Sequence, residues 1–351
     1  MKKEHILVIR FSAMGDVAMA VPVVYSVAMK YPDVRITVLS RGYARPFFED
    51  LAPNVNFMEA DVKREYHGVR GLNTLYRRLT AKQFTKVADL HNVLRSEYLR
   101  MRFNLGRYRV EHINKQRAQR RALTSKKHKV RRQLSSSFQK YADVFARLGY
   151  PVDEIRFRSL FPEEGGNLNL LPAIVGPKKS FQQWIGIAPT AAHPAKEYPQ
   201  PLMRKVIGML AERYPLARFF LFGRGQHEEQ LFQTWCEELP QCVSVDRHLE
   251  NMQQELILMS HLDVMLSMDS ANMHLASLTA TPVVSIWGAT HPFAGFMGWQ
   301  QPAENIIQAD LDCRPCSIYG NKKCKRGDLA CMNMITPEQI VEKMEAILRR
   351  K

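Results

Sequence analysis

The sequence predicts an α/β protein with two doubly wound domains, each built on a parallel sheet. The length of 351 residues is comfortable for two domains, and 46% hydrophobic residues supply two cores. Short apolar runs alternate with helical segments in two successive series, as in doubly wound sheets. Between the series, residues 161–180 are rich in proline and glycine, which is typical of a linker.

The first series begins with the apolar run Ile6–Ile9, which predicts a buried parallel strand. The glycine-containing turn Phe11–Asp16 follows it, and a helix is expected next. The remaining predicted elements of this series are a helix at 17–30, strands at 36–39, 57–58 and 87–90, and a helix at 135–148. We assign residues 1–165 to the N-terminal domain and residues 166–183 to the linker.

The second series predicts strands at 184–188, 218–222, 264–267 and 283–286, with helices at 201–214, 228–239 and 271–277. These elements define a C-terminal domain at residues 184–335. A final helix at 336–351 opens at Thr336, which is a good cap, and Pro337 suits its first turn.

No segment of the sequence predicts export or membrane insertion. The run Ile6–Ile9 is too short for the apolar part of a signal peptide, and no stretch approaches the roughly 20 apolar residues that span a bilayer. We therefore expect a cytoplasmic protein that is soluble or peripheral. In that compartment, six cysteines favour free thiols or a metal site over disulfides.

The formal charge of +16 is concentrated in one basic run, residues 100–132. This run carries 13 Lys and Arg residues against the single acid Glu111, and its few apolar residues predict a segment outside the core. Such blocks are often interaction segments, although a solvated loop without a partner is the alternative. Stacking aromatics are sparse and no nucleic-acid-binding motif is present. An anionic membrane surface or a phosphorylated lipid therefore fits at least as well as nucleic acid.

The turn at residues 12–16 is the first candidate site. It lies between the first strand and the first helix, where backbone amides favour an anionic group. Asp16 is either a helix cap or a general base that deprotonates a hydroxyl nucleophile. The turn has one glycine and no G-x-G-x-x-G motif.

Residues 267–274 form the second candidate site, again between a strand and a helix. Asp269 could accept both hydroxyls of a ribose, while Ser270 and the amides of Ala271 and Asn272 could bind a diphosphate. His274 lies one turn further along. The alternative is that Asp269 only caps the helix and that His274 is a core histidine.

Two further loops follow strands of the second domain. Lys196, in the loop 189–196, would neutralise a leaving diphosphate without a metal, although a loop lysine often has no role. In the segment 223–229, Gln226 could touch the nucleotide. Glu228 and Glu229 are better explained as first-turn residues that complement the helix dipole.

Four cysteines lie within 19 residues, with the spacing of Cys313-x2-Cys316-x7-Cys324-x6-Cys331. This spacing could hold zinc, but disulfides and free thiols are equally open. Neighbouring cations are expected to lower the thiol pKa values: Lys322, Lys323, Lys325 and Arg326. Because no histidine lies within the segment, we expect a structural rather than a catalytic role.

Three of these segments resemble the lipopolysaccharide heptosyltransferases, glycosyltransferase family 9. Residues 6–22 (ILVIRFSAMGDVAMAVP) resemble the opening of that family, and residues 267–292 (SMDSANMHLASLTATPVVSIWGATHP) resemble its donor-site segment. The loop Cys313–Met332 is similar to one in many members. The resemblance implies a GT-B fold, with two facing Rossmann-like domains, a cleft between them and a final helix that packs back toward the N-terminal domain. It also implies inverting, metal-independent transfer of heptose from ADP-L-glycero-β-D-manno-heptose to the lipopolysaccharide inner core.

The resemblance assigns roles residue by residue. Asp16 matches the general base, Lys196 the lysine that faces the donor diphosphate, and Asp269 the ribose-binding aspartate. The expected donor site further comprises Thr190, Gln226, Ser270, Ala271 and His274. The expected acceptor-binding residues are Ser12, Met14, Gly15, Arg120 and Arg121. The ADP-sugar would be a co-substrate, with no cofactor required.

The expected partners are an anionic glycolipid of the lipid A–Kdo type and the cytoplasmic face of the inner membrane, without nucleic acid. The sequence departs from the family pattern at Ser270–Ala271, where Thr-Gly or Ser-Gly is usual, at His291 and at Gln226. These changes leave open a GT-B transferase with another nucleotide-sugar. A basic nucleic-acid-binding protein is a further alternative, and an inactive nucleotide-sensing relative is disfavoured by Asp16 and Lys196.

Overall fold

The computed structural model describes residues 4–350, which divide into two compact units. The first unit comprises residues 4–116 and Ser135–Leu160, and the second comprises Arg117–Leu134 and residues 161–350. Residues 1–3 and 351, at the ends of the predicted first domain and last helix, lie outside the described residues.

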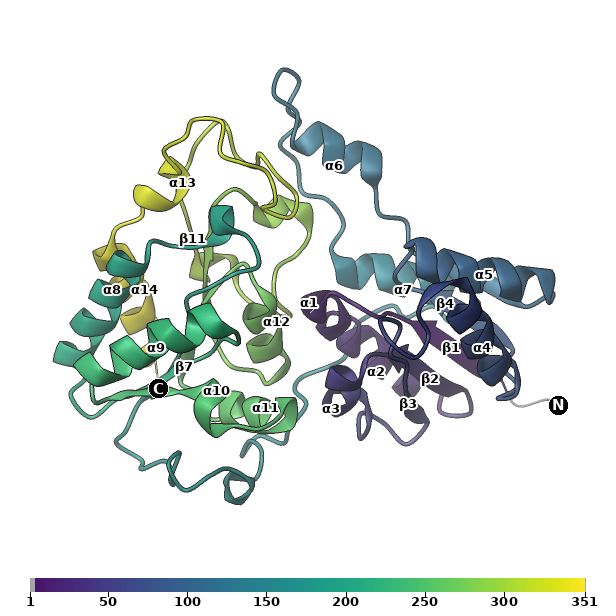
Figure 1. Ribbon diagram of the computed structural model, residues 1–351, viewed down its shortest axis with the longest axis horizontal. Coiled ribbons are helices and arrows are strands. Elements are labelled where there is room, and N and C mark those ends of the chain that lie inside the picture. The colour runs from purple at the N-terminus through teal and green to yellow at the C-terminus, as the bar shows by residue number, and fades with distance from the viewer. Residues whose placement is uncertain (1–3, 351) are drawn as a thin grey trace. The chain divides into compact units, whose positions relative to one another are not determined.

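The first unit is built on a five-stranded parallel sheet with the order β3-β2-β1-β4-β5 (Figure 1). Its strands are β1 His5–Ile9, β2 Arg35–Ser40, β3 Val55–Glu59, β4 Lys86–Asp89 and β5 Arg109–His112. All five residues of β1 are buried, which is typical of a strand covered on both faces of its sheet. The strand order changes direction between the neighbours β1 and β4.

The helices of the first unit are α1 Met14–Ala18, α2 Val21–Lys30, α3 Arg45–Phe48, α4 Gly68–Thr80, α5 Leu94–Leu105 and α7 Ser137–Arg147. The single helix predicted at 17–30 is wrong, because the chain breaks at Met19–Ala20 into α1 and α2. Pro22 explains the break. Proline disrupts a helix interior but is accommodated in a first turn, and Pro22 lies in the first turn of α2.

The second unit contains a six-stranded parallel sheet with the order β11-β10-β9-β6-β7-β8. Its strands are β6 Trp184–Ala188, β7 Arg218–Leu221, β8 Cys242–Ser244, β9 Val264–Met268, β10 Val283–Trp287 and β11 Ile306–Gln308. The order changes direction between β6 and β9. The prediction of two doubly wound parallel sheets is therefore confirmed.

The helices of the second unit are α6 Arg117–Leu123, α8 Gln200–Arg213, α9 Gln226–Glu238, α10 Val245–His248, α11 Met252–Ser260, α12 Ala271–Leu278, α13 Ala330–Asn333 and α14 Pro337–Leu348. The last helix, α14, opens as predicted: the Thr336 side chain accepts a hydrogen bond from the Gln339 N–H, and the Gln339 side chain accepts one from the Thr336 N–H. Its apolar residues Ile340, Val341 and Met344 join the core of the second unit, and α14 packs against α8 there.

The basic run lies mostly outside the core, as predicted, but part of it forms regular elements. It includes the end of α5, β5 and α6, and Phe103 and Leu123 within it are fully buried. The Phe103 ring packs against Tyr76 and Tyr108, with centroids 5.0 Å away in each case. Some cations of the run lie on these elements, such as Arg109 on β5 and Arg121 on α6, while Lys126 and Lys127 lie in the irregular segment that follows. From residue 117 to residue 134 the run groups with the second unit, although we had assigned it to the first domain.

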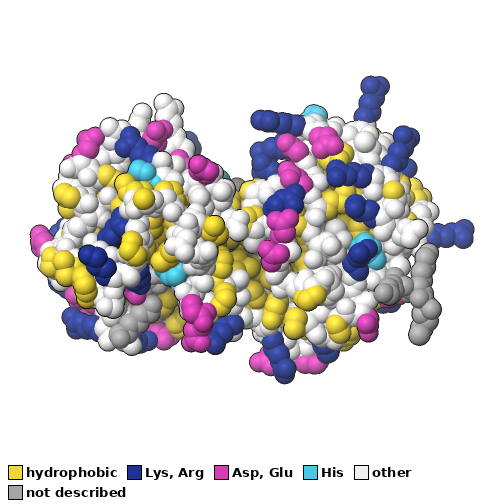
Figure 2. Space-filling view, turned by 90° about the horizontal axis from the view of Figure 1, so that it is seen from below, with side chains coloured by type: hydrophobic (Ala, Val, Ile, Leu, Met, Phe, Trp, Pro, Cys, Tyr) yellow, Lys and Arg dark blue, Asp and Glu magenta, His cyan; other side chains and the backbone are white. Residues whose placement is uncertain are grey.

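The surface shows charges of both signs. On the face in Figure 2, Lys and Arg side chains are interleaved with Asp and Glu, so this face is not a uniform basic patch. Within residues 4–350, no helix combines the length and the apolar character needed to cross a bilayer.

Candidate active site

The candidate residues lie where the strand order of each sheet changes direction. In open α/β sheets, ligands bind at the carboxyl ends of the strands at this point. Asp16 follows β1, whose neighbour across the change is β4. Lys196 and Asp269 follow β6 and β9, the corresponding pair of the second sheet. Each unit thus carries one candidate cluster at the position that its topology favours for a ligand.

Asp16 is ion-paired with Arg10 rather than acting as a cap. The distance from Arg10 Nη2 to Asp16 Oδ2 is 2.6 Å, and the two side chains are 6% and 26% exposed. The N-cap of α1 is Ala13, which has no side-chain capping bond. Tyr141 Oη donates to the Asp16 carbonyl at 3.1 Å, and Arg10 Nη1 donates to the Leu90 carbonyl at 2.6 Å. These contacts fix a carboxylate that still reaches solvent.

The cation beside Asp16 is permanent. Burial by itself lowers the pKa of Arg10, but Asp16, with Tyr141 and Asp89, raises that pKa above its ordinary value. An arginine side chain does not lose its proton in proteins, so the carboxylate always faces a positive charge. Around this pair, Ser12 and Met14 are half-buried and Gly15 is buried.

His91, which the sequence reading did not single out, lies in the same part of the first unit. Its side chain packs edge-on against Phe11 at a centroid distance of 5.9 Å, and the residue is 8% exposed. Burial, followed by the charges of Arg10 and Lys115, lowers the pKa of His91 to about 3. The imidazole is therefore neutral at physiological pH.

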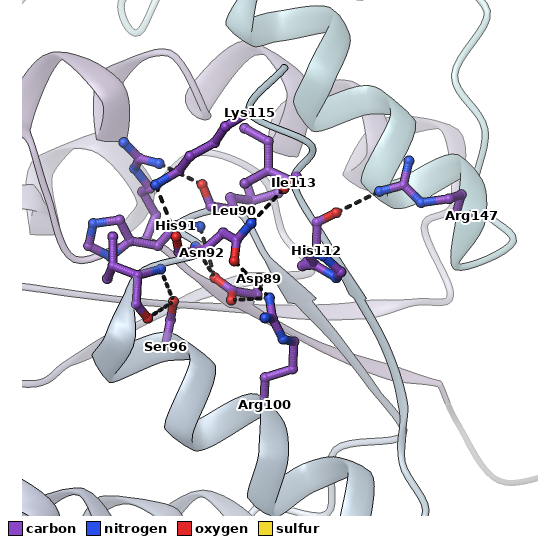
Figure 3. A network of polar contacts seen from close by, with 12 residues as sticks. Asp89, Leu90, His91, Asn92, Ser96, Arg100, His112, Ile113, Lys115 and Arg147 are labelled. Atoms are coloured by element: carbon purple, nitrogen blue, oxygen red, sulfur yellow. Dashed lines mark hydrogen bonds and ion pairs between the residues drawn. The ribbon is translucent and has the colours of Figure 1, made fainter. Parts of the chain in front are cut away.

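A buried carboxylate holds the loop that carries His91 (Figure 3). Asp89 Oδ1 accepts hydrogen bonds from the backbone N–H groups of His91 and Asn92, both at 2.9 Å. Arg100 Nη1 lies 3.2 Å from Asp89 Oδ2 and 3.2 Å from Asn92 Oδ1. The sequence predicts the strand at 87–90, and Asp89 near its carboxyl end, two residues before His91, was the available signal for this cluster.

In the second unit the structure brings Lys196 and Asp269 together. Lys196 Nζ lies 3.0 Å from Asp269 Oδ2, and the side chains are only 14% and 7% exposed. Thr290, which follows β10, donates its hydroxyl to the same oxygen at 2.7 Å. Asp269 does not cap α12, since the N-cap of that helix is Ser270. Three loops of the sheet thus converge on one carboxylate.

The start of α12 lies directly after Asp269. Ser270 is extended and makes no capping bond, and its hydroxyl lies 3.3 Å from that of Ser267. Ala271 is half-buried at the first helical position, so the first amides of α12 are suited to an anion. His274 is buried within α12, and its carbonyl accepts a hydrogen bond from the Ser277 hydroxyl at 2.7 Å.

The other two predicted donor residues lie at the same edge of the sheet. Thr190 is half-buried, two residues after β6. Gln226 is exposed as the first residue of α9, after β7. Because β7 lies on the side of β6 away from β9, Gln226 follows a strand that is two positions from the one leading to Asp269.

The predicted acceptor residues Arg120 and Arg121 group with the second unit and not with Asp16. Arg120 Nη1 donates to Tyr319 Oη at 2.7 Å, and its guanidinium lies 5.2 Å from the centroid of the Phe296 ring. Arg121 is exposed. Part of the basic run is therefore engaged in contacts within its own unit, which its charge pattern did not predict.

All four cysteines of the predicted cluster are free: Cys313, Cys316, Cys324 and Cys331. Among residues 4–350, no three His, Cys, Asp or Glu side chains are placed to hold a metal ion. Burial raises the pKa of Cys316, and it raises that of Cys331 to about 11. Burial also acts to raise the pKa of Cys324, but the N–H groups of residues 326, 327 and 329 lower it overall. The prediction that flanking cations set the thiol pKa values is therefore wrong for these three cysteines.

Arg314, also missed from the sequence, is a buried cation between two of these cysteines, with 3% exposure. Its Nη2 donates to the carbonyls of Trp287 and Thr290 at 2.9 and 3.0 Å, and its Nε donates to the Gly288 carbonyl at 2.5 Å. Its remaining acceptors are the carbonyl of Ala309 and Gln308 Oε1. A single arginine in a basic, cysteine-rich segment gave no sign of this role.

Comparison with known proteins places the chain among glycosyltransferases. The model of glycosyltransferase family 9 (heptosyltransferase) matches residues 72–325, well over half of the chain. A lipooligosaccharide heptosyltransferase 2 of Haemophilus influenzae is 23% identical over 99% of this chain and 100% of its own length. A protein of the same name from Campylobacter jejuni is 23% identical over 48% of this chain, and the match spans about half, 52%, of that relative.

Solved structures support the same fold. A family 9 glycosyltransferase from Veillonella parvula has a TM-score of 0.75 and 18% identity, covering 100% of this chain and 99% of that one. The E. coli heptosyltransferase WaaC with ADP has a TM-score of 0.68 and 17% identity, covering 98% of this chain and 99% of that one. The predicted GT-B fold is confirmed. With the family match over residues 72–325, the chain belongs to glycosyltransferase family 9, the heptosyltransferases.

Proposed function

We propose that this glycosyltransferase moves heptose from ADP-heptose to an inner-core sugar of lipopolysaccharide or lipooligosaccharide, with inversion at the anomeric carbon. The observation that carries the proposal is the Lys196–Asp269–Thr290 cluster beside the start of α12. A carboxylate, a cation and helix amides are the groups that a ribose and a diphosphate require. The two heptosyltransferase relatives and the ADP in the E. coli structure agree with this assignment.

The donor half of the proposal concerns the second unit. Asp269 would accept the ribose hydroxyls, and Lys196, held beside that carboxylate, would face the diphosphate. The amides that follow Ser270 would share the developing negative charge. Thr190, Gln226 and His274 complete the proposed donor site. In this scheme a lysine and a helix N-terminus take the role that a divalent cation has in other transferases.

The chemical step requires a base, and Asp16 is our candidate. The acceptor hydroxyl oxygen forms a bond to the anomeric carbon while its proton passes to the Asp16 carboxylate. The bond from that carbon to the diphosphate oxygen breaks, and ADP leaves with the bonding electrons. Arg10 keeps the carboxylate in place through its 2.6 Å contact. Ser12, Met14 and Gly15 would line the acceptor side.

We further propose an anionic glycolipid of the lipid A–Kdo type as acceptor, bound at the cytoplasmic face of the inner membrane. Arg121 and Lys127 are exposed on the basic run and suit phosphate or carboxylate groups. Arg120, which is half-buried beside Tyr319 and Phe296, would contribute its charge from there.

A donor panel tests the proposal. Purified protein is offered ADP-heptose and other ADP-, UDP- and GDP-sugars with a Kdo-bearing lipid A acceptor, with and without EDTA. We expect transfer from ADP-heptose alone, unaffected by EDTA, and a product of inverted configuration by NMR. Preference for another nucleotide-sugar would overturn the donor assignment, and loss of transfer in EDTA would overturn the metal-independent scheme.

The base is tested separately with Asp16→Asn. We expect kcat to fall by roughly 10²- to 10⁴-fold, the usual contribution of a general base, with donor affinity retained. Asp153→Asn is the matched control in the same unit, because its ion pair with Lys30 is largely exposed. Near-normal turnover by Asp16→Asn would remove Asp16 from the mechanism.

A further inference from the structure

The segment 309–331, here called the cysteine loop, contacts the residues around Lys196 and Asp269 at several points. We propose that this loop is a positioning element that fixes the Lys196 ammonium and the Asp269 carboxylate in the donor site. Gly320 and Arg314 are its two positioning residues. The inference rests on the donor-binding role proposed for Lys196.

Gly320 forms a wall against the Lys196 side chain. Its φ of +79° is left-handed, and a Cβ at this position would lie 2.5 Å from Lys196 Cδ and closer still to Cγ. The Gly320 N–H donates to Ser317 Oγ at 3.0 Å, and Ser317 Oγ contacts Asn321 Oδ1 at 3.0 Å. The turn is thus held in place against the middle of the lysine stem, which any side chain at position 320 would have to displace.

The cysteine loop also reaches the backbone of Lys196 through a relay of hydrogen bonds. The N–H groups of Cys316 and Ser317 donate to the Ala289 carbonyl at 3.0 and 3.2 Å. The Ala289 N–H in turn donates to the Ala195 carbonyl at 3.0 Å. Gly288 permits this approach, because a Cβ there would lie 2.7 Å from the Ala195 oxygen. The residue before Lys196 is therefore tied to the loop.

Arg314 performs the same task for Asp269. It donates to the Thr290 carbonyl at 3.0 Å, and the Thr290 hydroxyl donates to Asp269 Oδ2 at 2.7 Å. One loop therefore constrains both partners of the ion pair, Asp269 through Arg314 and Lys196 through Gly320.

The functional consequence follows from the flexibility of lysine. Its four-carbon stem has many rotamers, and holding the ammonium in one place costs entropy at the moment of binding. A preformed wall removes alternative rotamers beforehand, so the positive charge already stands where the diphosphate develops its charge. Because Cγ and Cδ lie in the middle of the stem, displacing them moves Nζ.

Two glycines of the loop provide a matched test. Gly320 and Gly327 have nearly the same φ, +79° and +83°, but a Cβ at Gly327 would meet nothing within 4 Å. Gly320→Ala and Gly327→Ala therefore carry similar backbone strain and differ in the contact with Lys196. For Gly320→Ala we expect kcat/KM for ADP-heptose to fall about 10- to 100-fold, as for a reacting group displaced by about 1 Å. For Gly327→Ala, kcat/KM should stay within about twofold of the parent value. The two variants should have similar Tm values, because their backbone strain is similar.

The double variant Gly320→Ala/Lys196→Ala tests whether Gly320 acts on donor kinetics through Lys196. Lys196→Ala removes the atoms that Gly320→Ala would displace, so Gly320→Ala should cause no further loss of kcat/KM in the Lys196→Ala protein. If Lys196→Ala alone leaves donor kinetics unchanged, the proposed function of Lys196 fails. If Lys196→Ala is impaired but Gly320→Ala equals Gly327→Ala, or if the two losses multiply, the positioning inference is overturned and the donor site stands.

Discussion

Lys196 Nζ and Asp269 Oδ2 form a 3.0 Å ion pair that is almost completely buried at the carboxyl edge of the second sheet. Removing two charges from water is expensive, and their attraction often only offsets that cost. Such a pair is therefore weak evidence for a stabilising role. The pair follows β6 and β9, where the strand order changes direction and open α/β sheets bind their ligands, which supports the donor site proposed above.

Neutralising one partner of this pair should destabilise the protein more than neutralising both. Asp269→Asn keeps an acceptor for the Thr290 hydroxyl but leaves the Lys196 ammonium buried and unpaired, so we expect a loss of about 3–5 kcal/mol in the free energy of unfolding. Lys196→Met combined with Asp269→Asn should recover most of that loss while remaining inactive. Urea denaturation of the three proteins measures the difference, and equal stability of the single and double variants would contradict it.

Arg314 is expected to be among the most important cations for stability. Arg314→Met leaves several buried carbonyls without a donor, each worth about 1–3 kcal/mol, so a loss of at least about 3 kcal/mol is expected. Arg326→Met is the control from the same loop, since its pair with Asp328 is half-exposed and should contribute little to stability. Comparable melting temperatures for the two variants would contradict the stabilising role of the Arg314 hydrogen bonds.

Much of the fold could be predicted because its determinants are local. Buried parallel strands are short apolar runs, and helix starts carry recognisable residues such as Thr336 and Pro337. The regular elements within the basic run were not predicted, for a different reason. Its charges dominate the composition, whereas its few apolar residues, including Phe103 and Leu123, decide its structure by facing inward.

The candidate site was predicted only where function follows a strand in sequence. Asp16, Lys196 and Asp269 lie in the segments that directly follow β1, β6 and β9, so topology alone brings them to a sheet edge. Arg10 and Arg314 were missed because their roles depend on burial and on partners distant in sequence, such as Leu90 for Arg10. Neither property is visible in the residue type.

Lys129 should hold the basic run in place within the second unit. Its ammonium donates to the carbonyls of Asp312, Cys313 and Pro315 at 3.1, 2.7 and 3.1 Å. We expect Lys129→Met to accelerate tryptic cleavage at the neighbouring Lys126 several-fold. Loss of these hydrogen bonds should lower the free energy of local opening by about 1 kcal/mol, and trypsin cleaves the opened segment. Lys127→Met removes one tryptic site in the same way but changes an exposed side chain, so it should leave the cleavage rate unchanged. Mass spectrometry of timed digests measures both rates.

His91 should make the protein less stable as the pH falls. Its pKa is about 3 in the folded chain against an ordinary value of 6.5, so between these values the unfolded chain binds a proton that the folded chain does not. Stability is therefore retained above about pH 6.5 and lost as the pH falls toward 3, with a slope of at most about 1.4 kcal/mol per pH unit. His91→Phe keeps a ring against Phe11 and removes this proton, so the slope measured by urea denaturation between about pH 5 and 6.5 should decrease. His128→Phe, at an exposed position, should leave the slope unchanged, and an unchanged slope in His91→Phe would show that the buried ring does not resist protonation.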